Sequence, residues 1–395
     1  MRGNTVWQPP DERGSGKLNR PRLSPYYGIK YEIASSTKSA VDAGPGGGVC
    51  FTTIVTPCDF AELAELERIL EEGAAHFETR KLHEVAVGER RFPVYAVALG
   101  NPDPAVPGVG YFGGFHGLER IGAEVVLAYL RSLVMRLRWD SLLHRQLESM
   151  RLVFMPLVNP GGVFLGTRAN PSGVDLMRNA PLESSERAPF LIGGQRLSAG
   201  LPWYRGPTGA PMEPENQAVC RVVEAELHAR DFSLAVDCHS GFGLNDRIWF
   251  PYAYSSLPIE HLAELHALLE IYEQSYAHHN YLLEPQSRQY LAHGDLWDFL
   301  YRKAAERPQC VFLPLTLEMG SWLWIKKNPR QLFSRHGIFN PLIEHRQQRV
   351  LRRHLTWLDF VARAASGCRR WLPEGAARER HREAALDRWY RGVAS

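Results

Sequence analysis

The sequence contains no run of about 18 or more apolar residues, the length that a helix needs to cross a bilayer. Its first segment, MRGNTVWQPPDERGSGKLNRPRLSP, also lacks the apolar run that follows the charged start of a secretory signal. This segment is rich in Pro, Gly and Arg. We therefore predict a flexible leader, no export by this route and a cytoplasmic location.

Cysteine is scarce and follows no metal-binding or disulfide pattern. The six cysteines are scattered and form no C-x-x-C pair: Cys50, Cys58, Cys220, Cys238, Cys310 and Cys368. Nothing indicates the framework of a small secreted domain, so we expect reduced and mostly buried thiols. Cys238 adjoins a candidate ligand, but neighbouring side chains on a strand face opposite ways, which favours core packing for this thiol.

Charge of one sign is not in excess either. The sequence has 46 Lys and Arg against 43 Asp and Glu, which gives a formal net charge of +3. Such a balance does not favour a nucleic-acid binder or a membrane-surface protein. The Arg-rich pattern near the C-terminus is typical of a solvated helix face. We therefore expect no nucleic-acid partner and no membrane partner.

Strand and helix patterns alternate along the rest of the chain. Strands are predicted at residues 48–57, within 81–101 as two strands joined at Gly88, and at 107–115, 151–162, 232–243 and 309–322. Helices are predicted at residues 58–77, after Glu119, at 215–230 and 257–279, and from about residue 342. This order predicts an α/β fold with a mixed, mostly parallel central sheet flanked by helices. Sites in such folds lie at the carboxyl ends of strands.

His116 and Glu119 occur in GGFHGLER, at a predicted junction between a buried strand and a helix. An imidazole nitrogen and a carboxylate oxygen at this spacing can bind one zinc ion at about 2.0 to 2.2 Å. The pair alone is weak evidence, because a loop histidine beside a helix-capping glutamate has the same spacing.

A third candidate ligand, His239, follows a predicted strand in AVDCHSGFG, beside small residues. A catalytic zinc takes three protein ligands and keeps one position open for water. The alternative is a core histidine with satisfied hydrogen bonds. The order of the strands and the preceding His116 and Glu119 pair favour the metal ligand.

Glu318 ends an otherwise apolar strand in LTLEMGSW. A buried carboxylate is costly unless it meets a cation or transfers a proton. Beside a zinc-activated water it would act as a general base. The alternatives are a helix cap and a partner for a nearby arginine.

Taken together, these motifs resemble those of the zinc carboxypeptidases related to carboxypeptidase A. GGFHGLE resembles the family's H-x-x-E ligand pair, VDCHSG its second histidine and LTLEMG its catalytic glutamate. MPLVNPGG and RANPSGVDLMRN resemble its N-P-[DG]-G and R…G-V-D-x-N-R-N segments. The elements occur in family order, and the resemblance covers roughly residues 60–345.

The resemblance implies a zinc-dependent metallocarboxypeptidase, a hydrolase that cleaves the C-terminal peptide or amide bond with one zinc ion. His116, Glu119 and His239 would be the zinc ligands. Glu318 would be the general base that takes a proton from the zinc-activated water. Arg168 would polarise the scissile carbonyl and stabilise its oxyanion.

Substrate-binding residues follow from the same resemblance. Arg178 would pair with the terminal carboxylate, because a planar guanidinium binds a carboxylate through two hydrogen bonds. Asp175 would orient a zinc-bound imidazole. In YLAHGDLWDFLY, Tyr290 would cap the substrate and Trp297 would form part of the pocket for the departing side chain. The alternatives are surface-loop arginines and core aromatics of a helix.

Two positions depart from the family pattern and leave the substrate open. Met177 stands where the family usually has Asn, which removes one hydrogen bond to a substrate carboxylate, and Leu118 replaces an arginine common in digestive members. GGFHGLE also resembles zinc deacylases such as aspartoacylase, so an N-acyl amino acid or a cell-wall peptide is an alternative substrate to an ordinary peptide. A non-catalytic metal-binding scaffold is a further alternative, although it has no use for a general base.

The resemblance also divides the chain into parts. Residues 1–59 are predicted to be an N-terminal leader and extension, and residues 60–345 a zinc carboxypeptidase-like catalytic domain. Residues 346–395 are predicted to form a C-terminal helical segment whose charged end frays.

Overall fold

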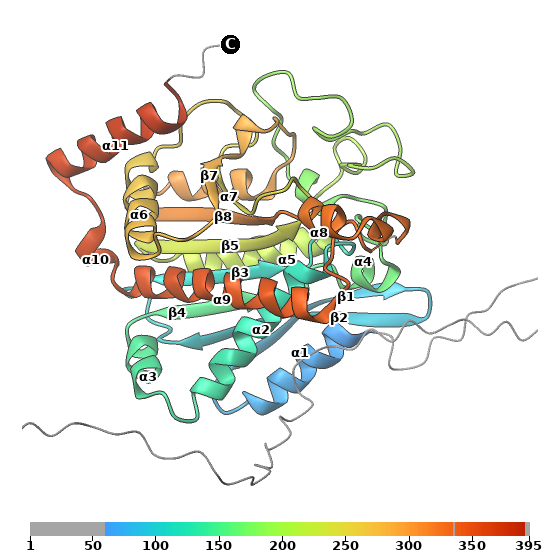
Figure 1. Cartoon of the computed structure of the whole chain (residues 1–395), viewed down its shortest axis with the longest axis horizontal. Coiled ribbons are helices and arrows are strands. Elements are labelled where there is room, and N and C mark those ends of the chain that lie inside the picture. Colours follow the sequence, from blue (N-terminus) through green and yellow to red (C-terminus); the bar gives the residue numbers. More distant parts are fainter. Residues whose placement is uncertain (1–59, 335, 392–395) are drawn as a thin grey trace, which may run out of the picture. The chain divides into compact units, whose positions relative to one another are not determined.

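The computed structural model describes residues 60–334 and 336–391 (Figure 1). The strand predicted at residues 48–57 lies outside the described residues, as do Cys50 and Cys58. The other four cysteines are free and buried, as the sequence predicts.

The described part of the chain contains an eight-stranded sheet with the order β1-β2-β4-β3-β5-β8-β6-β7 (Figure 1). The strands are β1 (Glu78–Val87), β2 (Arg90–Gly100), β3 (Gly108–Gly113), β4 (Arg151–Met155), β5 (Phe232–Ser240), β6 (Arg247–Phe250), β7 (Leu282–Pro285) and β8 (Val311–Met319). Strands β4, β3, β5 and β8 pair in parallel, while β1, β2 and β6 each have an antiparallel neighbour. The predicted mixed, mostly parallel sheet is thus confirmed.

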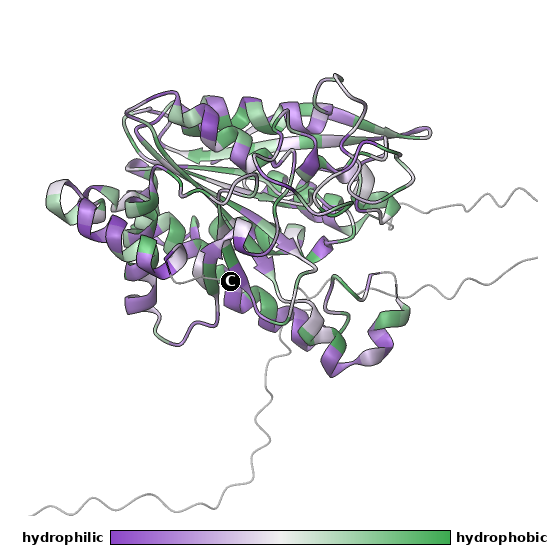
Figure 2. Cartoon of the chain, turned by 90° about the horizontal axis from the view of Figure 1, so that it is seen from above, coloured by the Kyte–Doolittle hydropathy of each residue, from purple (hydrophilic) through white to green (hydrophobic). Residues whose placement is uncertain are grey.

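Helices cover both faces of this sheet, as Figures 1 and 2 show. One core contains residues of α1 (Ala61–Glu72), α2 (Arg120–Arg136), α3 (Ser141–Glu148), α6 (Leu262–Ser275) and α9 (Glu344–Ser366). The other contains residues of α5 (Pro214–Val223), which a π-helical turn at Glu224–His228 extends, and of α7 (Leu296–Ala305). The central strands are buried on both sides, and this explains their nearly continuous apolar sequences.

The shorter elements connect the layers. They are α4 (Pro160–Leu165), α8 (Trp322–Lys327), α10 (Cys368–Trp371) and the short helical turns Leu176–Arg178, Gln286–Arg288 and Pro329–Phe333. Helix α11 (Gly375–Trp389) falls in the stretch predicted to fray, yet it is helical and buries Ala385 and Trp389. None of the helices in the described ranges has both the length and the apolar character needed to cross a membrane.

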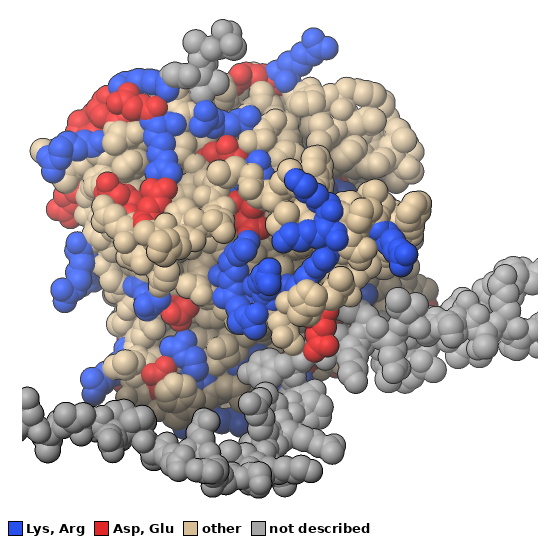
Figure 3. Space-filling view, viewed as in Figure 1, with Lys and Arg blue, Asp and Glu red and all other residues tan. Residues whose placement is uncertain are grey.

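Helix α9 belongs to the same core as the sheet. The boundary predicted between the catalytic domain and the C-terminal segment, at residues 345 and 346, lies in the first turn of this helix. Its Trp357 is fully buried, and the hydroxyl of Tyr111 on β3 donates a hydrogen bond to the carbonyl of Leu358 at 2.8 Å. The opposite side of α9 exposes Arg349 and Arg352. Figure 3 shows Lys and Arg side chains gathered over α9 and α8, in agreement with the predicted solvated face.

Candidate active site and metal centre

The candidate site lies where three parallel strands end. Strand β3 leads into the loop that carries His116, and Glu119 is the residue before α2. His239 on β5 and Glu318 on β8 are direct partners in the parallel register. Since the carboxyl ends of neighbouring parallel strands meet at one edge of the sheet, residues far apart in the sequence are brought together there.

Glycines make the tight junction after β3 possible. Gly114 has a positive φ of 69°, a conformation that costs other residues energy. At Gly117 a Cβ atom would lie 2.0 Å from the carbonyl carbon of Gly162, so only glycine fits beside that backbone. The glycines therefore turn the chain so that His116 and Glu119 face the same space.

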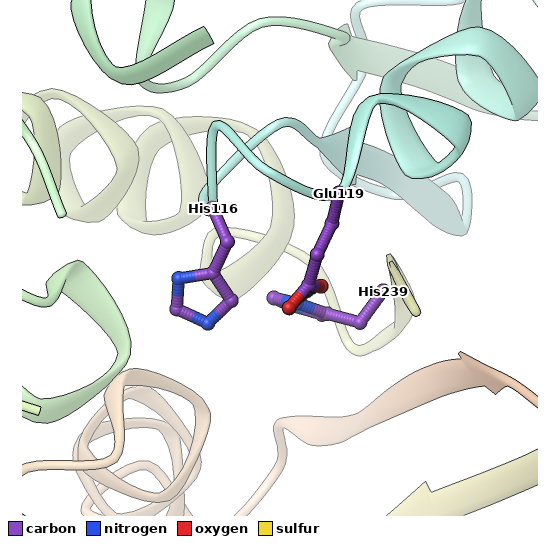
Figure 4. Close-up of side chains that lie close together, drawn as sticks. All are labelled: His116, Glu119 and His239. Atoms are coloured by element: carbon purple, nitrogen blue, oxygen red, sulfur yellow. Dashed lines mark hydrogen bonds and ion pairs between the residues drawn. The ribbon is translucent and has the colours of Figure 1, made fainter. Parts of the chain in front are cut away.

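The side chains of His116, Glu119 and His239 converge in the structure (Figure 4). One ligand atom from each lies within 4.8 Å of the others, and all three residues are buried. Glu119 Oε2 lies 3.1 Å from His239 Nδ1 and accepts a hydrogen bond from the Ser240 N–H at 3.0 Å. Two imidazoles and a carboxylate are thus brought together, as the sequence motifs predict.

Asp237 supports His239 from behind and was not identified in the sequence. Its Oδ2 lies 2.6 Å from His239 Nε2, so the Nε2–H is the donor and Nδ1 faces Glu119. Trp297 Nε1 donates to the same oxygen at 2.7 Å. The sequence signal for Asp237 is its place two residues before His239, because alternate residues of a strand share one face.

Trp297 does not lie where the resemblance implied. Its side chain is 3% exposed, packs edge-on against Phe112 and is not among the residues that line the cavity described below. The tryptophan therefore holds the carboxylate of Asp237 from the side of α7, and the structure does not bring it to a pocket for a substrate side chain.

Arg168 joins the centre to Asp175. Its Nε donates to Asp175 Oδ2 at 2.8 Å, its Nη1 to Glu119 Oε1 at 3.3 Å, and its Nη2 lies 2.8 Å from His116 Nε2. Asp175 Oδ1 is 3.8 Å from His116 Nδ1, which is beyond hydrogen-bond distance. In this structure Asp175 holds the guanidinium directly, and its predicted contact with an imidazole is only a longer electrostatic one.

The pKa values of the converging groups are strongly displaced. Burial and the Arg168 guanidinium lower the pKa of His116 to about 3, so its imidazole is neutral near pH 7. Burial raises the pKa of Glu119, but His116, His239 and Arg168 outweigh it and lower that pKa to about 2. Burial alone would lower the pKa of His239, but Asp237 and Glu119 outweigh burial and raise this pKa well above its usual value.

Glu318 has the opposite electrostatic environment. Its Oε1 accepts a hydrogen bond from the Phe242 N–H at 3.0 Å. Burial and the negative charge of Glu119 raise the pKa of this carboxyl to about 8. A carboxyl with such a pKa can exchange a proton near neutral pH, as a general base or acid must.

These residues fit a zinc ion. Two imidazoles and one carboxylate form a typical catalytic donor set, and one ligand atom of each lies within 4.8 Å of the others. The carboxylate of Asp237 fixes the tautomer of His239, as carboxylates beside metal ligands commonly do. His116, Glu119 and His239 are therefore the residues that would hold the metal.

A cavity of about 410 Å³ opens onto this centre. It contains the three candidate ligands and Glu318, and its wall includes Leu118, Arg168, Met177, Arg178, Trp203, Phe242, Trp249 and Tyr290. The structure thus brings together every predicted site residue except Trp297 and Asp175, which lie behind the wall.

Arg178 and Tyr290 meet at one side of the cavity. Arg178 is buried; its Nη1 donates to the Met177 carbonyl at 3.0 Å and its Nη2 to the Tyr290 hydroxyl at 3.4 Å. Its guanidinium carbon lies 5.7 Å from the centroid of the Tyr290 ring. The charge of Arg178 favours the ionised forms of the nearby carboxyls of Asp175 and Asp295, but no carboxylate hydrogen bonds to it within the described residues, so its guanidinium can pair with an anionic group in the cavity.

Comparison with known proteins agrees with the motifs. The family profile described as zinc carboxypeptidase matches residues 76–320. The catalytic chain of human carboxypeptidase N is 29% identical over 155 residues, which cover 35% of this chain and 32% of that protein. Its rat counterpart is 28% identical over 204 residues, or 45% of this chain and 42% of that protein. The chain thus spans less than half the length of these curated relatives.

Solved structures show the same fold. Bovine thrombin-activatable fibrinolysis inhibitor, solved in complex with tick carboxypeptidase inhibitor, has a TM-score of 0.56 at 18% identity, over 76% of this chain and 94% of that chain. Carboxypeptidase A from Helicoverpa armigera has a TM-score of 0.55 at 16% identity, over 76% of this chain and 71% of that chain.

Proposed function

The chain belongs to the zinc carboxypeptidase family, and on that premise we propose that it is a metallocarboxypeptidase that hydrolyses the C-terminal bond of a peptide. The observation that carries the proposal is that one cavity holds the ligand trio, the carboxyl of Glu318 and the guanidinium of Arg178. A C-terminal residue carries both a carboxylate to pair with Arg178 and a scissile carbonyl to react.

Arg178 would select substrates with a free terminal carboxylate. Its guanidinium is buried and held by the backbone carbonyls of Met177 and Ile192 and by the Tyr290 hydroxyl, so it is fixed in one orientation. Binding of a carboxylate to a fixed guanidinium is charge-assisted and can use two parallel hydrogen bonds. Tyr290 lies beside it and would cover the bound residue.

Glu318 would move the proton. When bound, zinc polarises the scissile carbonyl and lowers the pKa of a water molecule. Glu318 takes the proton of the attacking water on Oε2, because Oε1 already accepts from the Phe242 N–H. As the C–O bond forms and the C–N bond breaks, Glu318 returns this proton to the leaving nitrogen. A cation held by the neighbouring trio favours the ionised form of Glu318, which is the form that a base requires.

Arg168 would stabilise the negative charge that develops on the carbonyl oxygen. Its guanidinium lies at the cavity wall next to His116 and Glu119, and Asp175 holds it from behind through Nε. A preorganised cation at that position lowers the energy of the transition state more than that of the bound substrate.

The cavity constrains the reaction more tightly than the substrate, which leaves the hydrolysis of N-acyl amino acids as a second candidate. Met177 lines the cavity beside Arg178 and its thioether is at most a weak hydrogen-bond acceptor. A substrate carboxylate would thus gain fewer hydrogen bonds here than beside an amide side chain. A small acylated amino acid presents the same carboxylate and the same scissile amide as a peptide end, and it would use the same residues.

The test is hydrolysis of a mixed pool of peptides and N-acyl amino acids by zinc-loaded protein, followed by mass spectrometry. We expect loss of single C-terminal residues, and we expect Glu318→Gln to reduce the rate at least a hundredfold while zinc content stays the same. The amide keeps the shape of Glu318 but cannot accept the proton of a water. Full activity of Glu318→Gln would refute the proposed role. Deacylation without peptide trimming would favour the second candidate, and no turnover of any compound would favour a metal-binding scaffold.

A further inference from the structure

A second group of potential metal ligands lies on helices α6 and α11. His266 and Glu270 are four residues apart on α6 and therefore lie on the same face of that helix. His381 comes from α11, and its Nδ1 lies 3.0 Å from His266 Nδ1 and 4.0 Å from Glu270 Oε2. One ligand atom from each residue lies within 4.8 Å of the others.

The spacing of these atoms suits a tetrahedral transition metal. With a zinc–nitrogen distance of about 2.0 Å, two ligand nitrogens of one ion are about 3.3 Å apart. The two Nδ1 atoms at 3.0 Å are close to that value, while the Glu270 oxygen, 4.0 Å from His381 Nδ1, would move closer when an ion binds. Glu270 adds a carboxylate oxygen, so the donors are again two imidazoles and one carboxylate, the types that zinc prefers.

The group is buried on the side of His266 and open to solvent on the side of Glu270 and His381. His266 is 8% exposed and lies edge-on to Trp389, with the ring centroids 5.7 Å apart. The Glu270 side chain is 44% exposed and that of His381 is 24% exposed, so an ion and a water ligand can reach the group from solvent. The guanidinium of Arg388 on α11 pairs with Glu273 at 2.6 Å, which offsets its repulsion of a cation.

Helix α11 packs along α6 and reaches the main core. It buries Ala385 and Trp389, Trp389 Nε1 donates to the Leu283 carbonyl at 2.7 Å, and ion pairs join Arg378 to Glu264 and Arg388 to Glu273. Partly exposed ion pairs contribute little to stability. A metal ion held between the two helices at the middle of α11 would add a stronger link to these contacts.

We propose that His266, Glu270 and His381 bind a second transition-metal ion of the zinc type, which fastens α11 to α6. The site lies outside the catalytic cavity, and α11 lies outside the residues that the family profile matches. Its role is structural, and it does not depend on the proposed hydrolysis.

Zinc stoichiometry tests this inference. Untagged full-length protein is stripped with a chelator, equilibrated with buffered zinc and measured by inductively coupled plasma mass spectrometry. We expect two zinc ions per chain in the wild type, one in His381→Gln and one in His116→Gln, and none tightly bound in the double variant. Glu270→Gln should weaken the second ion at least tenfold. The matched control is His278→Gln, which changes an exposed histidine next to α6 and should retain both ions.

Hydrogen exchange of α11 gives a second readout that does not depend on activity. In His116→Gln, one equivalent of zinc should slow amide exchange in α11 at least tenfold, and this effect should disappear when His381→Gln is added. The inference is wrong if His381→Gln binds as much zinc as the wild type, or if stoichiometric zinc leaves exchange in α11 unchanged.

Discussion

At the scale of single residues, the centre depends on charged groups that hold one another in place. Asp237 accepts hydrogen bonds from His239 and Trp297, and Asp175 accepts one from Arg168. Each carboxylate is buried, so its partner must satisfy it. The orientation of the ligands is therefore set by residues that do not themselves line the cavity.

Asp237→Asn should weaken zinc binding by about ten- to hundredfold, the usual effect of losing a carboxylate behind a metal-binding imidazole. The amide is a poorer acceptor and no longer favours the tautomer in which His239 Nδ1 is free. Competition with a chromogenic chelator measures the affinity. Trp297→Phe is the matched control, because it removes only the other hydrogen bond to Asp237 and should weaken zinc binding less. Equal affinities of Asp237→Asn and wild type would contradict this role.

The residues of the centre were largely predictable from the sequence, while their contacts were not. His116, Glu119, His239 and Glu318 stand at strand ends in recognisable motifs, and the structure brings them together. Trp297 was misplaced because the motif does not say which face of α7 turns toward the sheet. Asp175 and Arg168 were identified, but their direct ion pair depends on a loop whose path no local pattern determines.

At the scale of elements, the junction between β3 and α2 decides whether the ligands can converge. Gly117 lies against the backbone of Gly162 at the start of α4, so the two segments touch without side chains between them. Any added atom must push one of them away. This contact links the first two candidate ligands to the loop that leads to Arg168.

Gly117→Ala should lower the free energy of unfolding by about 3 kcal/mol, the upper end of typical overpacking costs, because its Cβ would overlap the Gly162 backbone. Because this overlap must displace the loop that carries His116 and Glu119, the variant should also bind zinc more weakly. Urea unfolding of the metal-free protein measures the first effect. Gly88→Ala is the matched control, because a Cβ atom at Gly88 would meet no atom within 4 Å. This variant should lower the free energy of unfolding by only about 1 kcal/mol, because of the positive φ of Gly88. Similar losses in both variants would show that the overlap is unimportant.

Long elements were easier to predict than short ones for a physical reason. The buried strands β3, β5 and β8 and the helices α2, α6 and α9 span enough residues to show a hydrophobic pattern. Strands β6 and β7 have four residues each and gain their stability from neighbours in the sheet. Helix α3 was missed although Asp140 caps its N-terminus, accepting hydrogen bonds from the N–H groups of Leu142 and Leu143.

At the scale of the whole molecule, stability should depend on pH through histidines that fold into the core as neutral groups. His354 on α9 is 1% exposed, and its Nδ1 lies 2.8 Å from the Tyr281 hydroxyl. Burial lowers the pKa of His354 from 6.5 to about 4. The folded state thus binds fewer protons than the unfolded state between these two pH values.

The free energy of unfolding should therefore be highest above pH 6.5 and fall as the pH is lowered toward 4. A shift of this size amounts to about 3 kcal/mol from His354 alone. In His354→Gln the fall should be shallower by about that amount, as measured by urea unfolding at several pH values. His278→Gln serves as the exposed control and should retain the wild-type slope. An unchanged slope in His354→Gln would contradict the prediction.

We propose that the cavity recognises a free terminal carboxylate and hydrolyses the bond next to it. The most direct measurement compares the zinc-loaded protein on pairs of peptides that differ only in a C-terminal carboxylate or carboxamide, with products identified by mass spectrometry. We predict release of the last residue from the carboxylates only, and loss of that preference in Arg178→Gln. Equal cleavage of the amidated peptides, or cleavage at internal bonds, would show that the protein does not act as a carboxypeptidase.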